Sequence, residues 1–321
     1  MIRRLLMVAM VAMLGASCAA AAQDFPSKAV RLVVGYPPGG PADFTARLVA
    51  AGLQQQWRQS VIVENKPGAS AMIAADLVAR ASPDGYTVLL GTIQSHAMNA
   101  ASIKKMLYDP VRDFTPLSQV TRANWVLAAH SGLPAGSLQE LIALARARPG
   151  ELNYGSSGTG GVSHLAFEMF AAPLGLKMTH VPYKGTAQAV TDVVEGRVQL
   201  VMGDLPTLMP HFKSGRLKAM AVTGESRSPL LPEVPSLSDA VPGFDVQPWQ
   251  GLFGPAGMPA ALAARISADL SAVLRRPELR EKLQAAGVDP ASSTPQEFAE
   301  HVKRELARWT GAARSAGIQP E

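Results

Sequence analysis

The sequence predicts an α/β protein with two domains, in which mostly parallel sheets are flanked by helices. Segments with strand character alternate with segments of helical character, which is typical of this class. A strand, a loop rich in Gly, Pro and Ser, and a helix follow one another at residues 30–45, 87–97, 153–164 and 180–190. A chain of 321 residues, of which 47% are apolar, is long enough for two cores.

The N-terminal half of the mature chain begins with three strands. Apolar runs rich in β-branched residues predict strands at 29–36, 60–68 and 86–92. Phe44, Leu48, Leu53 and Trp57 fall near helical spacing after the first run, and a second helix is expected from about Ser70 to Ala81. Strand-like segments follow at 113–120 and 125–130, and Pro149-Gly150 ends a helix that begins near residue 137.

The rest of the chain continues the alternation. Strands are expected near 152–156, 178–182, 198–204 and 217–222, with helices between them, and the region from about Ala260 to Ala316 is mostly helical.

The first 22 residues predict a secretory signal peptide that is removed. Arg3 and Arg4 precede a short apolar run, and Ala20–Ala22 form an A-x-A cleavage site. The only cysteine, Cys18, lies in this leader and would anchor a lipoprotein if it were lipidated. Gly15 stands where a lipobox usually has a branched aliphatic residue, so we favour simple cleavage before Gln23.

Composition excludes several kinds of site. The mature chain would contain no thiol, and therefore no disulfide, zinc–thiolate site or cysteine nucleophile. The formal charge of +5 falls to +3 when Arg3 and Arg4 leave with the leader, and there is no basic cluster of the kind that binds nucleic acid.

Two loops are rich in potential hydrogen-bond donors. The loop at 35–43 either exposes the amides of Gly39 and Gly40 to an anion or is only a tight turn in which Asp43 helps the helix start. The loop at 155–161 resembles enzyme motifs without matching them. Thr159 replaces the last glycine of a nucleophile elbow, and Ser163 replaces the third glycine of a dinucleotide-binding loop. Because helix N-termini favour anions, such loops suit carboxylate oxygens.

Isolated polar residues leave alternatives open. His96 and His164 are either structural histidines or candidates for a general base or metal ligand, although no second ligand is spaced near them. Asp204 ends an apolar strand and either faces a ligand or caps the next helix. Lys184 is either a solvated loop charge or a cation beside an anionic ligand.

Six linked segments resemble the extracytoplasmic solute receptors of tripartite tricarboxylate transporters, the Bug/TctC type. They are KPGASAMIAADLVARASPDGYTVLLGT, YDPVRDFTPLSQV, RARPGELNYGSSGTGGVSHLAFEMF, HVPYKGTAQAVTDVVEGRVQLVMGD, PHFKSGRLKAMAVTG and PGFDVQPWQGLFGPAGMP. The resemblance implies a periplasmic-binding-protein fold with two lobes that close like a clamshell. It also implies a monomer without enzymatic activity, metal or cofactor, which passes a small carboxylate, or a related amide, to membrane permease subunits. One lobe would comprise 23–122 and the returning 226–321, and the other lobe 123–225.

The resemblance also implies the residues of the ligand site. In this implied site the Gly39 and Gly40 amides and the loop 156–159 clamp a carboxylate, Tyr36 and Tyr183 form walls, and Asp204 binds a donor or a water. The complete set is Tyr36, Pro38, Gly39, Gly40, Asp43, Thr92, Ser95, His96, Ser156, Ser157, Gly158, Thr159, His164, Tyr183, Lys184, Gly185, Thr186 and Asp204.

The chain departs from the family pattern at two places. Ser70-Ala71 stand where members usually have two glycines, and Ala100 follows Asn99 where a proline is common. We therefore expect an altered loop at 70–71 and a solute that differs from the commonest ones.

Two other functions are compatible with the residues. A secreted serine hydrolase would use Ser157 with His164 or His180, but the broken elbow motif and the lack of an orienting acid disfavour it. A receptor that signals to a partner, without transport, would have the same sequence features.

Overall fold

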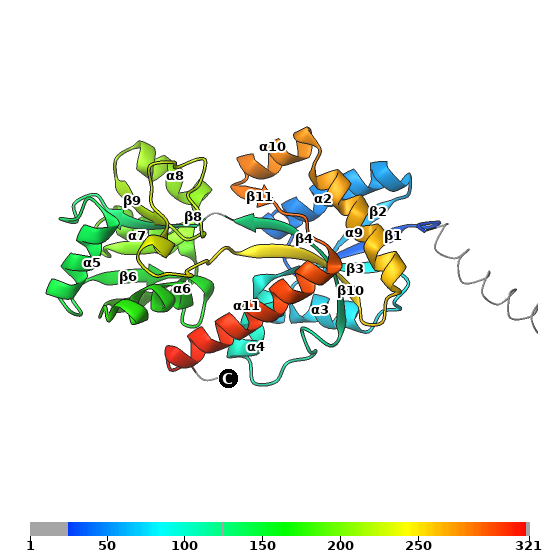
Figure 1. Cartoon of the computed structure of the whole chain (residues 1–321), viewed down its shortest axis with the longest axis horizontal. Coiled ribbons are helices and arrows are strands. Elements are labelled where there is room, and N and C mark those ends of the chain that lie inside the picture. Colours follow the sequence, from blue (N-terminus) through cyan, green and yellow to red (C-terminus); the bar gives the residue numbers. More distant parts are fainter. Residues whose placement is uncertain (1–24, 124, 319–321) are drawn as a thin grey trace, which may run out of the picture.

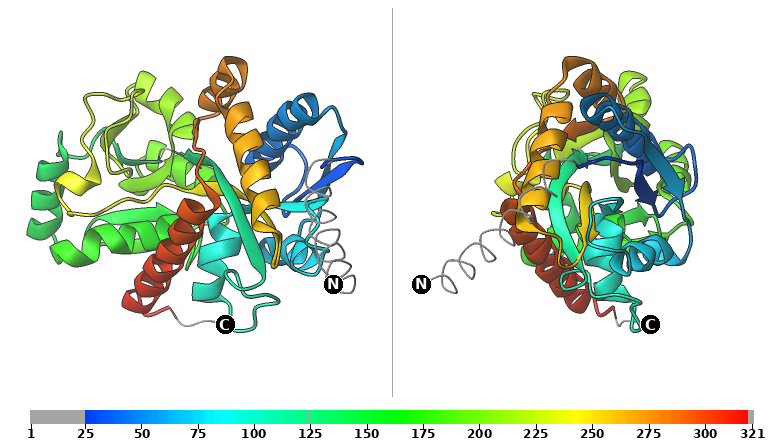
Figure 2. Two further views of the ribbon diagram at one scale, coloured as in Figure 1. Left: turned by 45° about the vertical axis from the view of Figure 1, so that its right-hand side comes forward. Right: turned by 90° about the vertical axis from the view of Figure 1, so that its right-hand side faces the viewer.

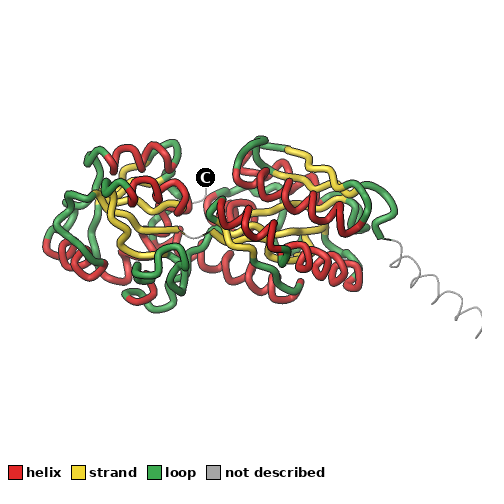
Figure 3. Tube along the Cα trace, turned by 90° about the horizontal axis from the view of Figure 1, so that it is seen from above, coloured by secondary structure: helices red, strands yellow, loops and turns green. Residues whose placement is uncertain are grey.

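A computed structural model describes residues 25–123 and 125–318. The predicted signal peptide, including Cys18, lies outside the described residues. The chain forms two α/β lobes, each built on one sheet with helices around it (Figures 1 and 3). The two-lobed α/β architecture predicted from the sequence is confirmed.

The first lobe contains a six-stranded sheet in the order β11-β4-β10-β3-β1-β2. Its strands are β1 (Val30–Val34), β2 (Val61–Asn65), β3 (Thr87–Thr92), β4 (Phe114–Ala123), β10 (Trp249–Pro255) and β11 (Val288–Pro290). Its helical segments are α2 (Pro41–Trp57), α3 (Met72–Ala79), the π-helix η2 (Gln94–Met98), α4 (Asn99–Ser102), α9 (Ala260–Leu274), α10 (Pro277–Ala285) and α11 (Pro295–Ser315).

The second lobe contains a five-stranded sheet in the order β7-β6-β8-β5-β9. Its strands are β5 (Trp125–His130), β6 (Asn153–Ser156), β7 (Thr179–Pro182), β8 (Leu200–Asp204) and β9 (Leu217–Val222). Its helices are α5 (Leu138–Ala147), α6 (Val162–Ala171), α7 (Thr186–Val194) and α8 (Leu205–Lys213), with short 3₁₀ turns at Ala172–Leu174 and Leu237–Asp239. A further 3₁₀ turn, Ala69–Ala71, precedes α3 in the first lobe.

The strand pairing is more mixed than the predicted, mostly parallel sheets. β1 pairs in parallel with β2 and β3, and β6 with β7 and β8. β10 runs antiparallel to β3 and β4, β11 to β4, and β5 to β8 and β9. The antiparallel pairs involve the strands that carry the chain between lobes or return after a long detour. Such strands need no crossover helix, so antiparallel pairing is open to them.

Alternate residues of the first sheet enter two different cores. Leu32 and Leu90 pack on the side of α2, α9 and α10, which lie together in Figure 2. Val33 and Leu89 point to the opposite face, as the two-residue period of a strand requires. The core on that face continues into the second lobe through Trp249, α11 and α6.

Residues after β9 remain bonded to the second sheet, which bears on the predicted lobe boundary at 225. Residues beyond 225 still bond to the second sheet, because the Val222 amide donates to the Pro235 carbonyl and the Val246 amide to the Thr223 carbonyl. We therefore propose that this lobe comprises about 125–247, with the chain passing between lobes after Ala123 and again at 247–249. α11 forms a third link, since it extends from the first lobe to contact α6 (Figure 1).

Candidate ligand-binding cleft

A cavity of about 670 Å³ lies between the two lobes. The first lobe contributes the loop before α2, the junction of β3 and η2, and the turn between α10 and β11. The second lobe contributes the first residues of α6 and α8, and the crossing strands form the remaining wall. The lining residues are Tyr36, Pro37, Pro38, Gly40, Pro41, Ala42, Thr92, Ile93, Gln94, Thr121, Ala123, Trp125, Val162, Asp204, Pro248, Trp249, Gln250, Ala286, Gly287 and Val288.

Tyr36 and Thr92 form a polar point on the first-lobe wall. The Tyr36 hydroxyl lies 2.9 Å from Thr92 Oγ1, and either oxygen can be the donor. Burial raises the pKa of Tyr36, so its hydroxyl stays protonated. Both residues belong to the predicted site, as do Pro38 and Gly40, which line the same wall.

Asp43 and Gly39 organise the loop instead of facing the cavity. The buried Asp43 carboxylate accepts hydrogen bonds from the Gly39 amide at 2.9 Å, from Asn65 Nδ2 at 2.9 Å and from Arg47 Nε at 2.8 Å. The bond from Arg47 is the largest cause that lowers the pKa of Asp43 to about 2. The Gly39 amide is therefore already used, and only Gly40 of the proposed amide pair reaches the cavity wall.

Ser95 and His96 lie behind the cavity. Ser95 Oγ donates to the Thr92 carbonyl at 3.1 Å, accepts from the Thr92 amide at 3.0 Å, and lies 2.9 Å from His96 Nδ1. The His96 ring is fully buried and stacks on Phe253 at 3.8 Å. Burial lowers the pKa of His96 to about 3, so the ring is neutral. The sequence left two roles open for His96, a structural one and a catalytic or metal-binding one. Its buried, stacked position favours the structural role, in which its ring anchors η2.

Asp204 lines the cavity and also caps α8. Facing a ligand and capping the next helix, the two roles considered for it, are therefore compatible. Its Oδ2 atom accepts from the Thr207 amide at 3.2 Å and from Thr207 Oγ1 at 2.5 Å. Among the described residues that line the cavity, Asp204 is the only charged one.

The loop 156–159 is ordered by internal bonds and does not line the cavity. Ser156 Oγ lies 2.6 Å from His180 Nε2 and accepts from the Gly158 amide. The Ser157 amide donates to Ser163 Oγ at 2.9 Å, and the two hydroxyls of Ser157 and Ser163 lie 3.1 Å apart. Thr159 is exposed. The amides and hydroxyls of this loop therefore do not contact the cavity in this structure.

His164 and His180 form a stacked pair behind this loop. Their ring centroids are 3.8 Å apart, and His164 Nδ1 accepts from the Gly160 amide at 3.0 Å. Burial lowers the pKa of His164 and lowers that of His180 to about 4. The pair is therefore neutral at physiological pH and fixes the loop.

The segment 183–186 also stands outside the cavity wall. The Tyr183 hydroxyl donates to Asp192 Oδ2 at 2.6 Å, and burial raises the pKa of Tyr183 to about 12. Lys184 is exposed, and Gly185 and Thr186 begin α7.

Several residues line the cavity although the sequence does not predict them as part of the site. Gln94, Thr121, Trp125 and Gln250 line the cavity, as does the turn 286–288. Gln250 stands in the PWQG stretch of a family-like segment, which was the only sequence signal for it. The turn 286–288 has no such signal, because it reaches the cleft only through the long return of the chain.

Two helices without a side-chain cap begin at the cavity wall. They are α2, at Gly40–Ala42, and α6, at Val162, whereas the start of α8 is already capped by the Asp204 carboxylate. The first amides of a helix lack partners within the helix and carry partial positive charge, so they attract anions.

The family model described as "Tripartite tricarboxylate transporter family receptor" matches residues 45–318. The chain belongs to this receptor family. It is therefore a solute-binding receptor, as the resemblance implied. Protein BugT of Bordetella pertussis is 31% identical over 96% of this chain and 95% of its own length.

Two solved structures resemble the receptor along most of its length. "R. palustris Rpa4515 with adipate" is 38% identical with a TM-score of 0.76, over 93% of this chain and all of that one. MatC (Rpa3494) from Rhodopseudomonas palustris, with bound malate, is 32% identical with a TM-score of 0.70, over 90% of this chain and 99% of that one.

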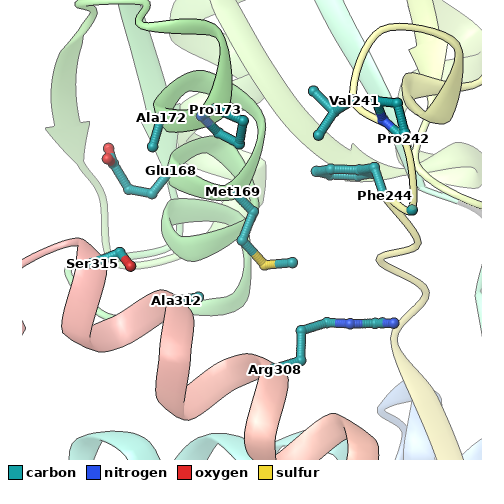
Figure 4. A pocket seen from close by; sticks show the side chains of 11 residues that line it. Glu168, Met169, Ala172, Pro173, Val241, Pro242, Phe244, Arg308, Ala312 and Ser315 are labelled. Atoms are coloured by element: carbon teal, nitrogen blue, oxygen red, sulfur yellow. The ribbon is translucent and has the colours of Figure 1, made fainter.

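A smaller cavity of about 270 Å³ lies between α6, the loop 241–244 and α11 of the receptor. Figure 4 shows Met169 of α6 pointing into it, with Phe244 on the opposite wall and Arg308 of α11 at one end. Arg308 donates to Glu305 Oε1 at 2.7 Å and to the Asp245 carbonyl. Its donors are thus partly engaged, and we regard the larger cleft as the ligand site.

Within 25–123 and 125–318, no group of three His, Cys, Asp or Glu side chains could hold a metal ion. No helix of these same ranges is both long and apolar enough to cross a membrane.

Proposed function

We propose that the receptor is exported to the periplasm, binds a small carboxylate between its lobes, and delivers it to the permease subunits of a tripartite tricarboxylate-type transporter. The observation that carries this proposal is the cleft of about 670 Å³ at which the uncapped N-termini of α2 and α6 meet. The adipate and malate bound in two family structures support the same ligand class.

The cleft favours an acid with an apolar body. Prolines, aliphatic side chains and the rings of Trp125 and Trp249 make up most of its lining. The Asp204 carboxylate would repel a compact polyanion of the citrate kind, since no Lys or Arg is among the described lining residues. A mono- or dicarboxylate can instead place one carboxylate at the helix ends and a hydroxyl, a protonated carboxyl or a bridging water near Asp204.

The remaining predicted contacts would form when the lobes close. The loops 156–159 and 183–186 precede α6 and α7 of the second lobe, and rotation about the crossing segments would bring their amides and hydroxyls to the ligand. In this closed form Ser157, Gly158 and Thr186 would supply donors opposite Gly40, and Tyr183 would face Tyr36.

The protein would act by binding alone, as a monomer without a cofactor. Ser157, the proposed nucleophile of the hydrolase alternative, has a serine hydroxyl and not a histidine beside it. Ser156 does contact His180, but Ser156 is completely buried and could not reach a substrate. Residues 1–22 would direct export and be removed before Gln23, without lipidation of Cys18.

A thermal-shift screen of the mature chain from Gln23 tests the proposal. The panel should hold aliphatic and aromatic mono- and dicarboxylates, including adipate and malate, together with citrate and neutral amides. A ligand that binds only the folded state raises the melting temperature by mass action. We expect a rise with at least one acid and recovery of that acid unchanged. Chemical conversion of the acid, or a panel in which only amides act, would contradict the proposal.

A further inference from the structure

The two lobes touch at one edge of the cleft through Gly287 and Pro206. Gly287 belongs to the turn between α10 and β11 in the first lobe, and Pro206 lies in the first turn of α8 in the second lobe. A Cβ atom placed on Gly287 would overlap Cγ and Cδ of the proline ring. Carbon atoms prefer a separation of about 3.5–4.0 Å, so no side chain fits between them.

This contact joins two walls of the cavity. Ala286, Gly287 and Val288 line it from the first lobe, and Asp204 lines it from the second. Pro206 follows Asp204 by two residues, so its ring is fixed relative to that carboxylate by the start of α8. The separation between Gly287 and Pro206 therefore sets the distance between the turn 286–288 and Asp204.

We propose that the Gly287–Pro206 contact is a stop that sets how closely the lobes approach at this edge and hence the width of the ligand cavity. The inference rests on the proposed function, in which the lobes move relative to each other around a solute. A stop must be stiff on both sides. The pyrrolidine ring of Pro206 has no rotamer that withdraws it, and Gly287 offers backbone alone.

Gly287 is required here for two separable reasons. Its φ of +77° favours glycine in any surroundings, and the proline ring excludes a Cβ atom. Gly257 has a similar φ of +82° but nothing within 4 Å of the position of its Cβ. Gly257→Ala therefore reports the conformational cost alone, whereas Gly287→Ala adds a wedge between the lobes.

The test measures the distance between the lobes and ligand binding in the same variants. Spin labels on Phe44→Cys in α2 and Ala187→Cys in α7 span the cleft, and both positions are exposed. The mature chain supplies no other cysteine. Distances between the labels are measured without ligand, and binding of adipate is measured by calorimetry, for Gly287→Ala, Pro206→Ala, the double variant and Gly257→Ala.

We expect Gly287→Ala to lengthen the distance between the labels in the ligand-free protein and to weaken adipate binding about tenfold, because overpacking must be relieved by separating the lobes. Adding Pro206→Ala should return both quantities to those of the Pro206→Ala variant, since the obstructing ring atoms are gone. Gly257→Ala should change neither.

The proposal is overturned if Gly287→Ala leaves the distance unchanged, or if Pro206→Ala does not reverse its effect. The double variant and Gly257→Ala carry the same kind of backbone strain, so poor folding of Gly287→Ala alone would itself point to the clash. If the unsubstituted protein binds neither adipate nor any other panel ligand, the proposed function fails. The ligand-free distances still decide whether the stop exists.

Discussion

At the scale of single residues, His96 holds the first-lobe wall of the cleft without touching the cavity. It stacks on Phe253, bonds to Ser95, and so anchors the π-helix η2, whose first residue, Gln94, lines the cavity. π-helical turns are unusual and often occur at functional sites. A neutral imidazole suits this position because a charged one would be buried among aromatic rings.

The buried imidazole makes stability depend on pH. The pKa of His96 falls from 6.5 to about 3 in the folded protein, so the unfolded state binds more protons as the pH falls through this window. Stability that is present above pH 6.5 is therefore lost between pH 6.5 and about 3. In urea unfolding, the native protein should lose about 2 kcal/mol more than His96→Phe between pH 7 and pH 5.

His96→Phe is a suitable comparison because Ser95 keeps its bonds to Thr92 and phenylalanine places a ring there that has no charge at any pH. The other histidines are common to both proteins and cancel. Equal losses in the two proteins would show that His96 becomes protonated without penalty in the folded state.

The sequence identified donors near the cleft but not the partners that already use them. Tyr36, Thr92 and Asp204, which the sequence predicts as ligand contacts, line the cavity. Gly39 was expected to bind ligand, but its amide is taken by Asp43, which follows it by four residues. The Tyr183 hydroxyl is similarly taken by Asp192. Such pairings depend on side-chain geometry within a turn, which a spacing of residue types does not specify.

At the scale of elements, the turn before α3 is strained. Ala69, Ser70 and Ala71 all have positive φ, at 45°, 53° and 69°. Each left-handed residue other than glycine costs roughly 1 kcal/mol or more. The departure from the family pattern at Ser70-Ala71 predicts an altered loop here. The helix predicted from Ser70 begins instead at Met72, because residues 69–71 turn the chain first.

Replacing one of these residues by glycine should stabilise the protein. Ser70 is exposed, and its carbonyl accepts a bond from Asn99 Nδ2 that glycine preserves. We expect Ser70→Gly to raise the free energy of unfolding by about 1 kcal/mol, measured by chemical denaturation. Ala307→Gly, on the exposed face of α11, should lower it by about 1 kcal/mol. A loss with Ser70→Gly would mean that the turn carries no strain.

α11 is fastened to the wall of the cleft by one buried carboxylate. Glu305 Oε2 accepts from the indole nitrogens of Trp249 and Trp309, each at 3.1 Å, and Oε1 accepts from Arg308. Trp249 lines the cavity, and Ile318 beyond α11 lies beside Gly160 of the second lobe. The helix thus links the cleft wall to the loop that precedes α6.

Removing this carboxylate should loosen both lobes. Glu305→Ala leaves two indole donors and the Arg308 charge without their partner, and we expect a loss of about 3 kcal/mol in chemical denaturation. Glu300→Ala, on the exposed face of the same helix, breaks only a surface pair with Lys303 and should cost at most about 0.5 kcal/mol. Similar losses for the two variants would refute a special role for Glu305.

Element types were predictable where the hydrophobic period is strong, but pairing partners were not. The alternation of strands and helices follows from local apolar patterns, as in β1 with α2 and β8 with α8. β10 lies beside β3 only after a detour through the whole second lobe, and no local pattern encodes that neighbour. Local patterns therefore do not predict that β10 and the turn after α10 form a wall of the cavity, and only the family-like PWQG stretch marks part of β10.

At the scale of the whole molecule, the lobes are joined at four places around one cavity. The chain passes between the lobes after Ala123 and again near 248, α11 reaches from the first lobe to α6, and Gly287 meets Pro206 at the cleft edge. A shared core at the crossing leaves rotation about it as the natural motion. We propose that a carboxylate binds in the larger cavity and is enclosed by that motion.

Calorimetric titration of two α6 variants with the acid that stabilises the native protein most tests this claim directly. Val162→Trp fills the larger cavity, whereas Met169→Trp fills the smaller one beside α11. Both positions are partly exposed on the same helix, so their folding costs are comparable. Our account predicts that Val162→Trp abolishes binding and Met169→Trp retains it at one site per chain. Binding that survives Val162→Trp and is lost in Met169→Trp would contradict it.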